Sequence, residues 1–188
     1  MLALQIPDVK AFMSQLLLGD TFDAFLLKEA EITTSVTHSI DGLLHPEFFD
    51  EADFSDDLIT WKDIKAHCFS IIRGKRTPLH FSFVFRLNKA NIEKLLDRNR
   101  IDLRPEQVAG LYLNCKFDGK RLLCTSGTAL TIFTLDKRID QLWDDMLIKF
   151  FQQHKIFFVQ SCPPFALHPF CVKQKQSPVR QLNPPIYV

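Results

Sequence analysis

The chain has 188 residues, of which 46% are hydrophobic and 24% are charged, as in an ordinary globular domain. No stretch approaches the roughly 20 consecutive apolar residues of a membrane-spanning helix, and the first residues, MLALQIPDVKAF, lack the basic start of a signal peptide. The five cysteines are an odd number, which argues against a secreted disulfide framework. We therefore expect a cytoplasmic protein with no membrane partner.

The charges are unevenly distributed along the chain. The formal net charge is +1, but residues 1–60 contain two bases and twelve acids, whereas residues 61–188 contain twenty-one bases and ten acids. Such an asymmetry is consistent with a basic face that meets an anionic partner, nucleic acid among them. The alternative is that the two regions neutralise each other within one fold.

The first predicted elements follow from the spacing of apolar residues. A short apolar run predicts a strand over residues 2–6, and helical spacing predicts a helix over residues 9–17. Alternation of apolar and polar residues predicts one half-buried strand over residues 30–40. The Asp41-Gly42 dipeptide is typical of a hairpin turn, after which Leu43-Leu44 would form the return strand.

The middle of the chain carries the clearest pattern. Thr60 predicts the N-cap of a helix over residues 61–72. In residues 79–88 large apolar residues alternate with mostly polar ones, which predicts a strand with Phe81, Phe83 and Phe85 on its buried side. Asn88 then predicts the cap of a short helix.

The last predicted elements rest on the same kinds of pattern, namely alternation, turn dipeptides and helical spacing. Alternation over residues 111–117 ends at Asp118-Gly119, which predicts a second hairpin. Two further strands are expected on either side of a turn at Ser126-Gly127. Asp136 predicts the cap of the final helix, which helical spacing predicts over residues 139–151.

These elements fall into two similar halves. Residues 2–74 and 79–153 each read as a strand, a helix, a hairpin and a helix with a tryptophan near its start, which suggests an internal duplication of a β-α-β(n)-α unit. Hairpins favour a mainly antiparallel sheet with helices packed on one face. The predicted fold is therefore α+β, in a single domain over residues 1–156.

The remaining residues, 157–188, differ in composition. They contain six of the ten prolines, the bases Lys173, Lys175 and Arg180, and no acid. A segment of this kind has little means of forming its own core. We interpret it as a proline-rich basic tail.

Several phrases of the sequence resemble one family. They are MLALQIPDVKAFMSQLL, FDAFLLKEAEITT, FSIIRGKRTPLHFSFVF, GTALTIFTLDK and LWDDMLIKFFQQH. Together, over about residues 1–156, they are similar to an uncharacterised family of clostridial bacteria that is catalogued only as a domain of unknown function. The resemblance implies a cytoplasmic bacterial protein and assigns no site residue.

The sharpest local feature is a cluster of cations around Gly74. Arg73, Lys75 and Arg76, with Arg86 on the following strand, would suit phosphate or carboxylate, since arginine offers a planar fork of donors. Three of them, however, follow the predicted helix 61–72, and the negative end of a helix dipole favours cations for stability alone. The sequence leaves both interpretations open.

Other groups of residues give weaker evidence for a catalytic, metal or cofactor site. The Ser126-Gly127-Thr128 stretch has no neighbouring base to activate a nucleophile. The spacing H-x7-C-x5-H-x2-C, from His154 through Cys162 and His168 to Cys171, fits structural zinc sites poorly. No phosphate-binding loop or dinucleotide glycine motif is present in the sequence. We therefore expect no metal and no cofactor.

Two functions are consistent with these observations. The first is a non-catalytic binding protein, which contacts nucleic acid or another anionic partner, or a protein, through its basic half. The second is a small-molecule enzyme or ligand-binding protein, whose site is assembled from residues that are distant in sequence. We favour the first, because no catalytic motif is found.

Overall fold

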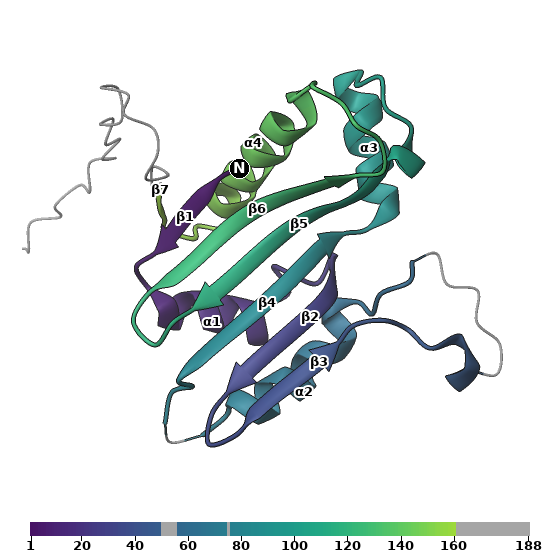
Figure 1. Cartoon of the computed structure of the whole chain (residues 1–188). Helices are drawn as coiled ribbons and strands as arrows, with labels where there is room; N and C mark the ends of the chain where they lie inside the picture. The colour runs from purple at the N-terminus through teal and green to yellow at the C-terminus, as the bar shows by residue number, and fades with distance from the viewer. Residues whose placement is uncertain (50–55, 75, 161–188) are drawn as a thin grey trace, which may run out of the picture.

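The computed structural model describes residues 1–49, 56–74 and 76–160. Within these residues, four α-helices accompany one seven-stranded sheet, so the predicted α+β class is confirmed (Figure 1). The strands are β1 (Ala3–Ile6), β2 (Phe25–Thr33), β3 (Thr37–Asp41), β4 (His80–Leu87), β5 (Val108–Phe117), β6 (Leu122–Leu130) and β7 (Val159–Gln160). The helices are α1 (Val9–Leu17), α2 (Trp61–Ile72), α3 (Lys89–Asn99) and α4 (Arg138–Gln153), with short 3₁₀ turns at Pro46–Phe48 and Pro105–Gln107.

The sheet is antiparallel throughout, in the order β3-β2-β4-β5-β6-β1-β7. The helices lie behind it in Figure 1, on one of its two faces. Side chains alternate between the faces of a strand, so every second residue points toward the helices. The predicted alternation in β4 is confirmed, because Phe81, Phe83 and Phe85 are all buried.

The core between sheet and helices is rich in aromatic rings. The Trp61 ring of α2 meets the rings of Phe83 and Phe85 edge-on, at centroid distances of 5.3 Å and 5.0 Å. Phe22, from the loop after α1, packs on Phe85 from a third element. Edge-to-face pairs add to the stabilisation from apolar burial, so these rings fix α2 on the sheet.

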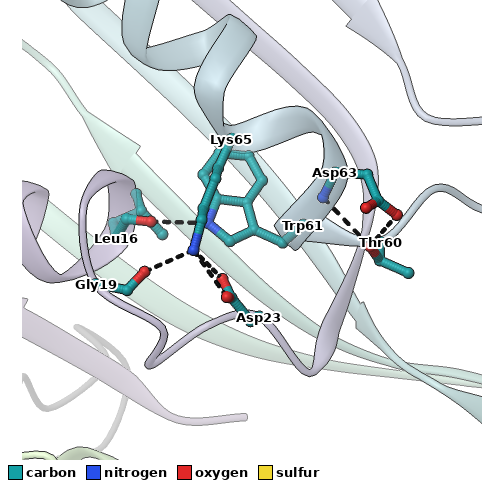
Figure 2. Close-up of polar contacts among 7 residues, drawn as sticks. All are labelled: Leu16, Gly19, Asp23, Thr60, Trp61, Asp63 and Lys65. Atoms are coloured by element: carbon teal, nitrogen blue, oxygen red, sulfur yellow. Dashed lines mark hydrogen bonds and ion pairs between the residues drawn. The ribbon is translucent and has the colours of Figure 1, made fainter.

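Polar contacts then set the position of α2 along the sheet (Figure 2). The indole N–H of Trp61 donates to the carbonyl of Leu16 at the end of α1, at 2.8 Å. Lys65 Nζ donates to the carbonyl of Gly19 at 2.8 Å and to the carboxylate of Asp23 at 2.6 Å. The predicted N-cap is also present, since the Thr60 hydroxyl accepts from the Asp63 N–H. This network joins α2 to the loop between α1 and β2.

The strand predicted over residues 30–40 is wrong, because it is two strands. β2 ends at Thr33, a tight turn follows, and β3 returns with Ile32 opposite His38. The Thr34 N–H donates to the Val36 carbonyl, which closes the turn at a point where the alternation in sequence continues unbroken. Asp41-Gly42 is therefore not the hairpin turn.

The return strand predicted at Leu43-Leu44 is also absent. Beyond Asp41 the chain leaves β2, and residues 57–60 enter the gap. The Leu44 N–H donates to the Asp57 carbonyl, and the Leu27 N–H of β2 donates to the Ile59 carbonyl. Strand-like hydrogen bonds therefore come from residues distant in sequence, which a hairpin signal does not reveal.

The turn predicted at Ser126-Gly127 lies inside β6, which continues from Leu122 to Leu130. Ser126 is buried beneath α4, where its hydroxyl accepts from the Leu2 N–H at 2.7 Å and donates to the Asp144 carboxylate. A buried hydroxyl needs such partners. Ser126 therefore lies within a strand, although the dipeptide Ser126-Gly127 is typical of a turn.

The element order β-α-β-β-α occurs twice along the chain. The two first strands, however, occupy different places, because β1 lies between β6 and β7 while β4 lies between β2 and β5. The internal duplication stays a prediction. The predicted tail begins at residue 157. Residues 157–160 are described and include β7, which pairs with β1. Residues 161–188 lie outside the described residues.

Candidate functional site

The face of the sheet opposite the helices, here called the open face, carries mostly polar side chains. The pairing register aligns one residue from each strand in a row across the whole sheet. From β3 to β7 this central row is Ser39, Glu31, Ser82, Lys116, Leu123, Gln5 and Val159. Its β3 end is charged and polar, whereas Leu123 and Val159 near β7 are exposed apolar residues.

The open face is hollowed over β2, β3 and β4, and the hollow has a volume of about 1030 Å³. Its charged lining holds five carboxylates and three cations, and we call it the acidic hollow. The carboxylates are Glu29, Glu31, Asp41, Asp57 and Asp118, and the cations are Lys28, Arg86 and Lys116. His80, Ser39 and Ser82 add neutral polar groups. The hollow therefore has an excess of acids.

A bulge in β2 shapes one side of the acidic hollow. The register with β4 shifts between Leu27 and Glu29, so Lys28 is an extra residue. A bulge re-aims the side chains around it. Lys28 Nζ lies 5.5 Å from the centre of the Tyr112 ring, a cation–π contact with β5. Glu29 then stands directly opposite Asp41 on β3, so two carboxylates share one edge of the hollow.

Two further carboxylates of the hollow are held in the ionised form. The hydrogen bond from Arg86 lowers the pKa of Asp57 from its usual value. The backbone N–H groups of Arg121 and Lys120 lower the pKa of Asp118 in the same way. Hydrogen bonds to a carboxylate favour its charged form. The negative charges of Asp57 and Asp118 therefore persist into mildly acidic solution.

Arg86, one of the predicted anion-binding residues, lies at the edge of this hollow and is buried. Its guanidinium pairs with the carboxylate of Asp57 and, at 3.4 Å, with that of Asp56. The charge that would meet an external anion is therefore matched by two carboxylates of the same chain.

The other predicted anion-binding residues lie at the opposite end of β4. Arg73 is the exposed C-cap of α2, Arg76 is exposed in the loop that follows, and Lys75 lies outside the described residues. β4 begins at His80, and Arg86 is six residues further, about 20 Å along a strand. The structure thus does not bring Arg86 together with Arg73 and Arg76.

The three described cysteines are free and buried. Cys115 and Cys124 face each other across β5 and β6, with 3.5 Å between their sulfurs. Burial raises the pKa of Cys68 to about 11 and also raises that of Cys124. A reactive cysteine needs the thiolate form, so the thiols of Cys68 and Cys124 are not suited to nucleophilic catalysis.

Metal ligands do not gather in the part of the chain that the structure describes, where no three histidine, cysteine or acidic residues could hold an ion. Of the weak zinc pattern, Cys162, His168 and Cys171 fall outside that part. Nor does any described helix have the length and apolarity to cross a membrane.

Comparison with known proteins relates the chain to a family. Residues 15–159 match a family described as "Family of unknown function (DUF5721)", which covers most of the chain. The chain belongs to this family. No curated protein and no solved structure matches it. For this DUF5721 member, any function has to be argued from the geometry of its own residues.

The acidic hollow of this DUF5721 chain was missed by sequence reasoning. A local signal exists, because Glu29 and Glu31 are two residues apart and so share one face of a strand. The other carboxylates come from β3, from the loop before α2 and from the turn after β5. Only the strand order places them around one hollow.

Proposed function

We propose that the protein is a non-catalytic binding protein of the cytoplasm, and that its partner binds in the acidic hollow on the open face. The observation that carries this proposal is a hollow of about 1030 Å³ with five carboxylates against three cations. The four described helices all pack on the other face, which leaves the hollow accessible in the described residues. Three free thiols fit a reducing compartment.

The charge of the hollow indicates the chemistry of the partner. Glu29 and Glu31 are exposed, whereas Arg86 is already matched by Asp56 and Asp57. Complementary charge steers association and suppresses partners of the wrong sign. A basic segment of another protein fits this lining better than nucleic acid does, because phosphates would meet an excess of carboxylates.

A small-molecule ligand is the second candidate function. The observation that favours it is the same concave site, in which His80, Ser39 and Ser82 join the charged groups. Ligand pockets are, however, lined mainly by apolar and aromatic side chains. Eleven of the seventeen residues that line this hollow are charged or polar, and this composition favours a macromolecular partner.

Fluorescence anisotropy with three labelled probes tests the proposal at low ionic strength, where charge contacts are least screened. The probes are a short oligolysine peptide, an oligoglutamate peptide and an oligothymidylate. We expect the full chain to bind oligolysine most tightly. Each exposed charge contact contributes roughly 0.2–1 kcal/mol, so Glu29→Gln with Glu31→Gln should weaken oligolysine binding by about two- to thirtyfold.

The matched control removes two acids away from the hollow. Glu93→Gln with Asp97→Asn changes two exposed carboxylates of α3 and should leave the affinity for oligolysine nearly unchanged. Equal weakening by the two pairs of substitutions would contradict the proposal. Preferential binding of oligothymidylate would favour the anionic partner expected from the basic half of the sequence.

A further inference from the structure

The described chain ends at one side of the open face. β7 is an edge strand. Val159 is the last residue of the central row and lies two strands away from Leu123. Residues 161–188 follow directly after Gln160. The described chain therefore ends at the edge of the sheet that borders the open face.

The composition of residues 161–188 complements the acidic hollow. They contain the bases Lys173, Lys175 and Arg180 and no acidic side chain. The pair of Arg86 with Asp57 lies within the hollow, and outside that pair four carboxylates face two cations. Complementary charges of this kind steer association and fix the register of two surfaces.

The reach of the chain is sufficient. Five strand spacings of about 4.8 Å separate β7 from β2, which is about 24 Å. Lys173 is thirteen residues beyond Gln160, and a chain of that length spans up to about 43 Å. Lys173, Lys175 and Arg180 can therefore all arrive at Glu29 and Glu31.

The path across the open face is also suitable. Between β7 and the hollow, the central row exposes Val159 and Leu123, which are 51% and 38% accessible. The first part of the segment carries Phe165, Leu167 and Phe170 ahead of its bases. Apolar residues of the segment would thus meet apolar residues of the sheet, and the bases would follow at the carboxylates.

We propose that residues 161–188 of the same chain bind across the open face and place their cations in the acidic hollow. This inference rests on the proposed function and deepens it, because the segment then competes with any external basic partner. An occupant tethered to its own site has an effective concentration in the millimolar range. A partner must displace it, so the segment sets an affinity threshold for binding.

Carbodiimide cross-linking of the full chain tests the contact, since this reagent joins a lysine amine directly to a touching carboxylate as an amide. Mass spectrometry should find links from Lys173 or Lys175 to Glu29, Glu31 or Asp41. The internal control is Lys65 with Asp23, whose atoms lie 2.6 Å apart. If the control link forms and no link joins the segment to the hollow, the inference is wrong.

A mixture of ¹⁵N-labelled and unlabelled chains separates binding within one chain from binding between two. We expect each linked pair of peptides to carry a single isotope label. Pairs of mixed label would show that a second copy provides the occupant, which would overturn the proposal for the same chain.

Oligolysine binding separates this inference from the proposed function. Replacing Lys173, Lys175 and Arg180 by glutamine should raise the affinity for oligolysine several-fold, whereas replacing the exposed Lys94, Lys149 and Lys155 should not. Unchanged affinity in the first variant, with oligolysine still bound at the hollow, would refute the inference alone. Cross-links without oligolysine binding to either variant would instead refute the external partner and keep the inference.

Discussion

The sequence and the structure assign different roles to Arg86. In the sequence it is a cation next to a basic cluster. In the structure it is buried and held by Asp56 and Asp57, which come from the loop before α2. Its buried guanidinium thus has two carboxylate partners within the chain, as a buried charge needs. Arg86 therefore fixes this loop to β4, at the edge of the acidic hollow.

The Arg86–Asp57 pair gives a prediction about pH. Arg86 lowers the pKa of Asp57 in the folded state, so the pair stabilises the protein above the unfolded pKa of about 4. That stability is lost as the pH falls through the lower, folded pKa. At neutral pH, Asp57→Asn should lower the free energy of unfolding by about 1 kcal/mol, a small value because the Asp57 side chain is 54% exposed.

Urea unfolding at a series of pH values measures this difference. The gap between the wild-type protein and Asp57→Asn should be constant near neutrality and close as the pH falls below about 4. Asp145→Asn, at an exposed position of α4, is the control and should show no gap. A gap that persists unchanged in acid would mean that Asp57 acts through packing rather than charge.

At the scale of elements, the chain diverges from β2 just after β3, and the residues around this point (Asp41, Leu43, Asp57 and Leu58) line one side of the acidic hollow. Gly42 follows β3 at the point where residues 57–60 enter between the strands. The Gly42 N–H donates to the Lys28 carbonyl, which holds the two chains close at the bulge. A side chain at position 42 would lie 1.9 Å from the Leu27 carbonyl oxygen. Glycine is required here because the backbones approach so closely.

Gly42→Ala should therefore destabilise the protein by about 1–3 kcal/mol, since the backbone has to move to accept the methyl group. Gly74→Ala is the matched control, because a methyl group there meets no atom nearer than 4.0 Å. Thermal unfolding followed by circular dichroism compares the two variants. Equal melting temperatures for both would contradict the close approach at Gly42.

At the scale of the whole molecule, the fold class was predictable and the candidate site was not. Alternation identified β4 and its three buried phenylalanines, because that pattern is local. Turn signals failed at Asp41-Gly42 and at Ser126-Gly127, where partners distant in sequence supply the hydrogen bonds. The acidic hollow depends on strand order and on a register shift, which no local pattern contains.

Pairing between the two parts of the chain also explains why the uneven charge along the sequence does not by itself indicate one basic face. The asymmetry between the two parts of the sequence suggested one basic face. The structure matches part of that charge internally, as in the pairs of Lys65 with Asp23 and of Arg86 with Asp57, which join the basic part to the acidic part. The acids of β2 and β3 that are left then face outward on the open face. An excess of basic residues in one part of the sequence therefore does not show that they form one basic surface.

The most direct test of the account is to map where oligolysine binds on the full chain, by following backbone amide shifts of ¹⁵N-labelled protein during a titration. The account predicts that the largest changes occur at Glu29, Glu31, Ser39, Ser82 and Lys116, around the acidic hollow. Changes concentrated on α1–α4 or near Arg73 and Arg76, with the open face unaffected, would contradict it.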